Sequence, residues 1–191
     1  MTRRTWTVFL MLSMLIAACA PSASSTSVPS ADATVTQTRS PSSGFGLKVG
    51  SPAPDFTLKT LEGGEVSLSD YAGRPVFINF WASWCGPCRA EMPEIVEAYQ
   101  AHKDAGLEVL AINLTAQDTV ADARACVEEF QMPFPVALDE TGAVSKAYSL
   151  FGLPTSVFVD AQGVVHAVNA GPLTGEAIEQ YLAQTRSVPA R

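Results

Sequence analysis

The sequence predicts an α/β domain, a three-layer sandwich in which helices cover both faces of one central sheet. From about residue 48 onward, short apolar runs alternate with stretches in which apolar residues recur at helical spacing. Turn signals between alternating runs predict a hairpin near each end of this region. Strands separated by helices, followed by a hairpin and a last helix, are typical of such a layered architecture.

The segment that precedes this region begins with a predicted signal peptide, residues 1–18. Arg3 and Arg4 give it a charged start, and the apolar run that follows is too short to span a bilayer. The stretch Ile16-Ala17-Ala18-Cys19 is similar to the lipobox of bacterial lipoprotein precursors. This resemblance implies cleavage before Cys19 and a lipid anchor on its sulfur. The alternative is an ordinary signal peptide with a chance cysteine.

Residues 19–47 are rich in Ser, Thr, Ala and Pro and contain few large apolar residues. Such a segment has too little apolar surface to form a core, so we expect a disordered linker with a reach of about 30 Å. Residues 48–191 then form one domain of ordinary size. The net charge of −7 argues against nucleic-acid binding.

The first half of the domain is predicted to hold a hairpin, a buried strand and a long helix. Residues 53–58 and 66–68 alternate apolar and polar side chains around a Gly-rich turn at 62–64. Residues 76–81 are β-branched, aromatic and uncharged, which favours a buried strand. A helix follows and runs to about His102.

The second half is predicted to hold four strands and three helices. Pro133 ends the first helix of this half, and Thr174 caps the last one. The expected elements are, in order, a strand at 107–114, a helix at 118–131, a strand at 135–138, a helix at 143–148, a hairpin of strands 155–159 and 164–168 around a turn at 160–163, and a helix at 175–184.

The segment Trp84-Cys85-Gly86-Pro87-Cys88 carries the chemistry that this sequence suggests. It lies between the 76–81 strand and the long helix, which places Cys85 at or next to the helix N-cap. Unpaired backbone N–H groups and the positive end of the helix dipole favour a thiolate there. We expect an exposed Cys85 to attack a substrate disulfide and Cys88 to resolve the mixed disulfide.

The motif resembles the thioredoxin superfamily, whose namesake carries the same Gly-Pro dipeptide. The extra hairpin, the helix–strand insert after the second core strand and the run from Trp84 to Pro93 are similar to the TlpA/ResA-like branch. That branch consists of membrane-tethered extracytoplasmic thiol-disulfide oxidoreductases related to the AhpC/TSA redoxins. The resemblance covers residues 48–185 and also includes Gly152-Leu153-Pro154-Thr155.

The resemblance implies a lipid-anchored oxidoreductase that needs no cofactor and no metal. Its partners would be disulfide-containing substrate proteins and a membrane electron donor, and we expect a monomer. The Gly86-Pro87 dipeptide favours a reductant, for example in cytochrome c maturation, because thioredoxin has a low reduction potential. An oxidase or isomerase role stays open, since the surroundings of the cysteines also set the potential.

Glu91 follows Cys88 by three residues on the same helix face. A carboxylate held partly out of water has a raised pKa and is able to shuttle the Cys88 proton. The resembled branch has a functional acid at this position, whereas thioredoxin has a buried Asp on the preceding strand. Asn79 occupies that strand position here and cannot titrate.

Pro154 precedes the 155–159 strand, and the resemblance implies a cis Leu153–Pro154 bond that faces the cysteine pair. The backbone of Leu153 would then offer an edge to an extended substrate segment. Trp84, Gly86 and Pro87 complete the expected substrate-binding surface. An ordinary trans-Pro at the start of a strand is the alternative.

Other notable side chains are given structural roles. We expect Trp81 in the core, Arg89 on an exposed rim, Cys126 as a buried free thiol, and both His102 and His166 in solvent. A structural disulfide or half a zinc site are the alternatives for the cysteine pair, although the sequence contains no second Cys-x-x-Cys.

Two other functions compete with disulfide exchange. In a peroxiredoxin-like thiol peroxidase, a Thr stands three residues before the reactive cysteine, but Ala82 takes that place here. A copper-binding chaperone on the same fold would need a histidine, such as His166, beside the cysteines.

Overall fold

The computed structural model of this chain describes residues 47–186. The predicted signal peptide 1–18, the lipidation site Cys19 and all of the predicted linker except its last residue lie outside the described residues. None of the helices within residues 47–186 combines the length and the apolar character needed to cross a membrane.

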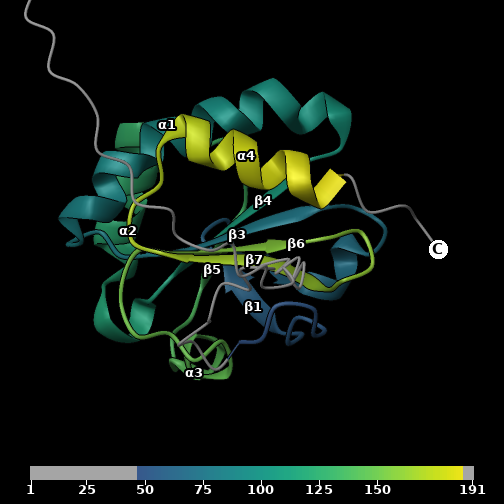
Figure 1. Cartoon of the computed structure of the whole chain (residues 1–191). Coiled ribbons are helices and arrows are strands. Elements are labelled where there is room, and N and C mark those ends of the chain that lie inside the picture. The colour runs from purple at the N-terminus through teal and green to yellow at the C-terminus, as the bar shows by residue number, and fades with distance from the viewer. Residues whose placement is uncertain (1–46, 187–191) are drawn as a thin grey trace, which may run out of the picture. The chain divides into compact units, whose positions relative to one another are not determined.

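The described residues form the predicted layered α/β domain around a seven-stranded sheet in the order β2-β1-β5-β4-β3-β6-β7. The strands are β1 (Thr57–Thr60), β2 (Glu65–Ser67), β3 (Val76–Trp81), β4 (Glu108–Asn113), β5 (Val136–Leu138), β6 (Thr155–Val159) and β7 (Val165–Ala170). The helices are α1 (Gly86–His102), α2 (Val120–Phe130), α3 (Ala143–Ala147) and α4 (Gly175–Arg186). Figure 1 shows α1 and α4 on one face of the sheet and α3 on the other.

The centre of the sheet is parallel and its margins are antiparallel. Strand β4 pairs in parallel with both β3 and β5, while β6 runs antiparallel to β3, and β7 antiparallel to β6. The two predicted hairpins are therefore confirmed as β1–β2 and β6–β7. The predicted insert, α2 followed by β5, places its strand between β4 and β1.

The two faces of the central strand β3 line different halves of the core. Phe77 and Trp81 pack into the cluster that includes residues of α1, α2 and α4. Ile78 and Phe80 pack into the cluster on the opposite face, with residues of α3 and the first hairpin. Because side chains alternate along a strand, Asn79 belongs to the α1 face.

The predicted boundaries agree with the structure to within about two residues, except in the first hairpin. The sequence predicted a strand from Ala53, but β1 begins at Thr57. Pro54 has no backbone donor for a ladder hydrogen bond. The Asp55 carboxylate instead accepts hydrogen bonds from the backbone of Phe56 and Ser69, which turns this segment into a loop.

The register of the sheet places the cysteine segment beside the turn before β6. Phe80, near the end of β3, lies opposite Thr155, the first residue of β6. Continuing this antiparallel register by one residue places Pro154 opposite Trp81. The chain leaves β3 after Trp81 and reaches Cys85 four residues later, so both functional segments stand at the same edge of the sheet.

Candidate active site

Cys85 caps the N-terminus of α1, as the sequence predicted. Its backbone N–H donates to the carbonyl of Ala82 at 3.1 Å, and its Sγ accepts from the backbone N–H of Cys88 at 3.2 Å. Pro87 occupies the first turn, where the missing N–H of proline has no intrahelical partner to lose. The local sequence thus places one backbone donor, the N–H of Cys88, on the Cys85 sulfur.

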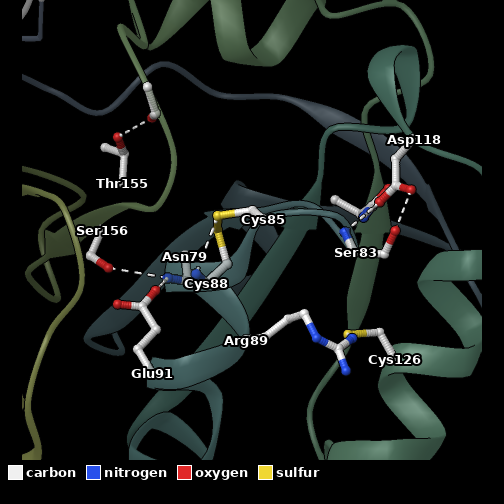
Figure 2. The surroundings of a disulfide bond; sticks show 12 residues. Asn79, Ser83, Cys85, Cys88, Arg89, Glu91, Asp118, Cys126, Thr155 and Ser156 are labelled. Carbon is white, nitrogen blue, oxygen red and sulfur yellow. Dashed lines mark hydrogen bonds between the residues drawn. A yellow bond between two sulfur atoms is a disulfide. The ribbon is translucent and has the colours of Figure 1, made fainter.

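Cys85 and Cys88 form a disulfide with an S–S distance of 1.99 Å (Figure 2). The expectation of an exposed Cys85 is wrong for this oxidised state, since the residue is 4% exposed and Cys88 is fully buried. The bond holds the Cys85 sulfur against Cys88, one turn inside the helix. Trp84, Gly86 and Pro87 are the exposed residues of the motif instead.

Glu91 is buried under the first turns of α1, and its relative exposure is only 2%. Asn79 Nδ2 donates to one of its carboxylate oxygens at 2.8 Å, and the backbone N–H of Leu173 donates to the other at 2.7 Å. Burial raises the pKa of Glu91 to about 7, because desolvation outweighs these two hydrogen bonds. The predicted titratable acid near Cys88 is therefore confirmed in its position and in the direction of its pKa.

Asn79 connects Glu91 to the neighbouring strand. Its Nδ2 atom also donates to Ser156 Oγ on β6 at 3.2 Å. Figure 2 shows the Glu91 carboxylate and the Ser156 hydroxyl both beside the Asn79 amide. All three residues are buried, so they form a small polar cluster inside the core.

Asp118 binds Ser83, two residues before Cys85, on the side of the cysteine segment away from Glu91. It was not predicted as a site residue. Its carboxylate accepts from the backbone N–H and the hydroxyl of Ser83 at 2.7 and 2.6 Å. It also accepts from Asn113 Nδ2 and from the backbone N–H of Thr119, each at 2.8 Å. Although desolvation raises the pKa of Asp118, these hydrogen bonds outweigh it and lower the pKa overall.

One sequence signal was available for Asp118. It lies just after β4, the strand that neighbours β3 in parallel, so both strands end at the same edge of the sheet. The proximity of Asp118 to the cysteine segment was missed because a helix was predicted to begin at this residue. An Asp before a helix is ordinarily interpreted as a cap.

The Leu153–Pro154 peptide bond is cis, which confirms the prediction for this turn. Pro154 is buried and Leu153 is half-buried. The Pro154 carbonyl accepts from the backbone N–H of Gly171, and the Gly152 carbonyl accepts from the Thr155 hydroxyl at 2.8 Å. Both bonds anchor the turn to the end of the sheet.

Trp84 projects into solvent with a relative exposure of 59%, whereas Trp81 is fully buried as predicted. The Trp84 indole N–H donates to the Gln117 carbonyl at 2.9 Å. Trp84 lines one side of a groove of about 580 Å³ whose other side includes Phe151 and Leu153. The expected substrate-binding residues Trp84 and Leu153 therefore share one groove, while Gly86 and Pro87 do not line it.

Arg89 and Cys126 contact each other. The predicted exposed rim position of Arg89 is only partly correct, because its guanidinium is half-buried and donates to Cys126 Sγ at 3.2 Å and to the Glu129 carboxylate. Cys126 is a buried free thiol, as predicted. Burial raises the pKa of Cys126, and the Arg89 charge opposes this shift.

The two histidines are less exposed than predicted. His102 is half-buried and lies 2.7 Å from a Glu179 carboxylate oxygen, so it packs between α1 and α4. His166 is half-buried on β7, next to Val165, which pairs with Val159 at the end of β6 remote from Pro154. The copper alternative required His166 beside the cysteines, and the register of the sheet places it at the opposite edge.

Two observations bear on the remaining alternatives. Residues 47–186 contain no cluster of three or more His, Cys, Asp or Glu side chains arranged to hold a metal ion. The buried residue three positions before Cys85 is Ala82, which offers no hydroxyl to a peroxide.

Comparison with known proteins agrees with this site. Residues 49–168 match the model of the AhpC/TSA family. The thiol-disulfide oxidoreductase ResA of Geobacillus kaustophilus is 42% identical over 136 residues, which cover 71% of this chain and 77% of ResA. ResA of Bacillus thuringiensis is 38% identical and aligns with 71% of this chain and 78% of its own length.

Solved structures give the same result. A provisionally assigned thiol:disulfide interchange protein DsbE from Chlorobium tepidum superposes with a TM-score of 0.67 at 37% identity, covering 72% of this chain and 96% of that protein. StoA from Bacillus subtilis superposes with a TM-score of 0.60 at 28% identity, covering 68% and 97%. Because the family match, these relatives and the capped cysteine pair agree, the chain belongs to the AhpC/TSA family of thioredoxin-like proteins and is a thiol-disulfide oxidoreductase.

Proposed function

We propose that this protein reduces disulfides of extracytoplasmic proteins, with Cys85 as the nucleophile and Cys88 as the resolving thiol. The observation that supports a reductant is that few hydrogen-bond donors would stabilise the thiolate form of Cys85. Within the described residues, the hydrogen bond that reaches its Sγ comes from the backbone N–H of Cys88. Strong oxidants stabilise their reduced form, and a thiolate with one neutral donor gains little of this stabilisation.

The first step is the attack of the Cys85 thiolate on one sulfur of a client disulfide. The Cys85–client S–S bond forms as the client S–S bond breaks, and the leaving client sulfur departs as a thiolate that takes a proton from water. The backbone N–H of Cys88, which donates to this sulfur in the disulfide, is the donor that would stabilise the attacking thiolate.

In the second step, Cys88 attacks Cys85 Sγ and releases the second client thiol. Cys88 is fully buried, so its proton needs an internal acceptor before it becomes a nucleophile. Glu91 follows it by one helical turn, and a pKa of about 7 lets the carboxylate take a proton at neutral pH and return it to solvent. The protein ends in the disulfide form that the structure shows.

The client segment is proposed to bind in the groove between Trp84 and Leu153. Trp84 and Phe151 are exposed aromatic side chains on its rim. An extended client segment beside Leu153 and Pro154 would use backbone hydrogen bonds, as in strand addition to a sheet edge. Gly86 and Pro87 would contact the client at the cysteine pair, since both are exposed.

Each turnover gives two electrons to the client, so a membrane electron donor must reduce the Cys85–Cys88 disulfide again. A lipid on Cys19 and the 19–47 linker would hold the monomeric domain near such a donor. Cytochrome c maturation is a suitable process, because it requires reduced thiols outside the cytoplasm. The similarity to ResA supports the disulfide-exchange chemistry on which this proposal rests.

The equilibrium of the cysteine pair with glutathione tests the proposal. We expect a reduction potential more negative than about −180 mV, the value of protein disulfide isomerase. A more positive potential would contradict the reductant assignment while leaving disulfide exchange intact. Cys126→Ser serves as the background for this measurement, because it removes the third thiol of the described domain.

Trapping variants test the roles of the two cysteines. Cys88→Ser is expected to accumulate a mixed disulfide with a model client such as insulin, since the resolving thiol is missing. Cys85→Ser is expected to form no such adduct and to lose insulin reduction. Adduct formation by Cys85→Ser at the rate of the parent protein would exclude Cys85 as the nucleophile.

A further inference from the structure

Asn79 carries a buried side-chain oxygen that has no hydrogen-bond partner. Among the described residues, the buried side-chain nitrogen and oxygen atoms without a hydrogen-bond partner are Asn79 Oδ1 and Trp81 Nε1. A buried acceptor without a donor costs about 1–3 kcal/mol, so such atoms are rare and each one needs an explanation. Both atoms belong to β3 and to its α1 face, which packs against the cluster that contains Cys88.

The hydrogen bonds of the Asn79 amide group fix which way this oxygen faces. A carboxylate only accepts hydrogen bonds, so the NH2 group, not the oxygen, must face ionised Glu91. The second N–H of this group donates to Ser156 Oγ. Both donors are thus used, and Oδ1 is left in the fully buried space under the first turn of α1.

Reduction of the disulfide creates a donor in this same part of the core. In the disulfide, Cys88 Sγ carries no proton, whereas the dithiol form has a fully buried S–H group that needs an acceptor. Cys88 and Glu91 lie one turn apart on α1, and Glu91 is in direct contact with Asn79. The thiol of Cys88 therefore needs an acceptor, and the unpaired oxygen of Asn79 needs a donor. Both lie on the same face of the sheet.

We propose that Asn79 is a positioning residue that couples Cys88 to Glu91. Its NH2 group holds the Glu91 carboxylate, and its Oδ1 atom accepts the hydrogen of the Cys88 thiol, directly or through one buried water, when the protein is reduced. This inference rests on the proposed roles of Cys88 and Glu91. Asn79 neither gains nor loses a proton. The two electrons of each turnover pass from the cysteines to the client, the Cys88 proton leaves through Glu91, and the client thiolates take their protons from solvent.

This coupling makes the reduced form more favourable, because the oxidised form leaves Oδ1 without a donor. Replacing Asn79 by Leu removes the unpaired atom from the oxidised form and the acceptor from the reduced form. We expect Asn79→Leu to shift the dithiol–disulfide equilibrium with glutathione about tenfold toward the disulfide, which equals about 30 mV for a two-electron couple.

Asn79→Ala provides a second variant in case the larger Leu disturbs packing, and it is expected to shift the equilibrium in the same direction. Ser156→Ala is the matched control, since it removes the other partner of the amide and leaves Oδ1 and Glu91 untouched. We expect its equilibrium constant to stay within about twofold of the parent. Thermal unfolding of each variant in both redox states verifies that it is folded.

A double-mutant cycle with Glu91→Gln separates the two halves of the proposal. If Oδ1 contacts the Cys88 thiol, Asn79→Leu must still shift the equilibrium by threefold or more when residue 91 is uncharged. A shift that disappears in this background would overturn the contact with Cys88 and reduce Asn79 to a support for Glu91. A shift below twofold in the parent background would overturn the whole inference, while the potential and the trapping results that test the proposed function would remain valid.

A spectroscopic measurement gives an independent result. In a variant that keeps Cys88 as its only cysteine, we expect the S–H infrared band to move to higher frequency when Asn79 is replaced by Leu, because the thiol loses its acceptor. An unchanged band would contradict the proposal whatever the equilibrium shows.

Discussion

Two carboxylates lie on opposite sides of the cysteine segment, and their environments differ in kind. Glu91 is 2% exposed and receives two hydrogen bonds, and its pKa is raised to about 7. Asp118 is half-buried and receives four hydrogen bonds, and its pKa is lowered. The balance between desolvation and hydrogen bonding therefore decides the charge of each group.

The difference separates a chemical role from a structural one. A carboxylate with a pKa near 7 exchanges protons at neutral pH, as a proton shuttle must. Asp118 stays ionised at neutral pH, and it connects Ser83, before the cysteines, to Asn113 at the end of β4. Four experiments test whether Glu91 and Asp118 have these different roles.

The largest effect is expected on stability when Glu91 is replaced by Gln. Glu91 has a pKa of about 7 in the folded protein, against an ordinary value of 4.5 for a glutamate in water, so the folded state binds the proton more tightly. Its contribution to stability is present below about pH 4.5 and is lost as the pH rises through about 7, by about 3 kcal/mol in total. Urea unfolding at several pH values should therefore show this loss in the parent and not in Glu91→Gln. Equal pH slopes for both proteins would contradict the raised pKa.

The second effect concerns the resolving step. We expect Glu91→Gln to slow the release of client from the mixed disulfide by about 100-fold at pH 7, the lower range of general acid–base catalysis. In the parent, the release rate should rise through about pH 7 as Glu91 ionises, and this rise should be absent from the variant. Rapid-quench measurement of the mixed disulfide gives both rates. The matched control Asp118→Asn should keep the pH profile of the parent, so an Asp118→Asn profile as flat as that of Glu91→Gln would break the comparison.

The third effect is the loss of stability in Asp118→Asn, which we expect to be about 1.5 kcal/mol at pH 7 because charge-assisted hydrogen bonds weaken. The lowered pKa of Asp118 means that its contribution to stability is present above the ordinary aspartate pKa of 3.8 and is lost as the pH falls through the lower pKa of the folded state. Denaturant unfolding at pH 7 and at about pH 3 measures this difference. A penalty that grows toward acid pH would be inconsistent with the lowered pKa.

The smallest effect is expected for Ser83→Ala, about 1 kcal/mol or less, because the Ser83 backbone N–H still donates to Asp118. The rate of attack by Cys85 should change by less than about threefold, which stopped-flow tryptophan fluorescence would measure. A larger loss of rate would show that the Asp118 side of the segment also takes part in the chemistry.

Much of the fold and part of the site could be predicted from the sequence. Within the described residues, periodicity and turn signals located the strands and the α-helices, although the first strand was predicted to begin too early and the short 3-10 helices were not predicted. The N-cap position of Cys85, the titratable Glu91, the buried Cys126 and the cis Leu153–Pro154 bond followed from motif spacing and resemblance.

The contacts that the sequence did not predict connect residues distant along the chain. Asp118 meets Ser83 across 35 positions, and Arg89 meets Cys126 across 37. Such pairs depend on how the insert packs against α1, and no local pattern encodes that packing. The burial of Cys85 was also missed, because in the disulfide its sulfur is bonded to that of the fully buried Cys88.

The attachment of the cysteine segment to the insert has a consequence for protein engineering. Ser83 is bonded to Asp118 in the turn before α2, and Arg89 is bonded to Cys126 and Glu129 within α2. The seven residues from Ser83 to Arg89 therefore do not form an independent unit that can be transferred alone. A graft that transfers them to another scaffold without α2 and the turn before it would leave Ser83 and Arg89 without their partners, and the grafted loop would lose the supports that fix its ends.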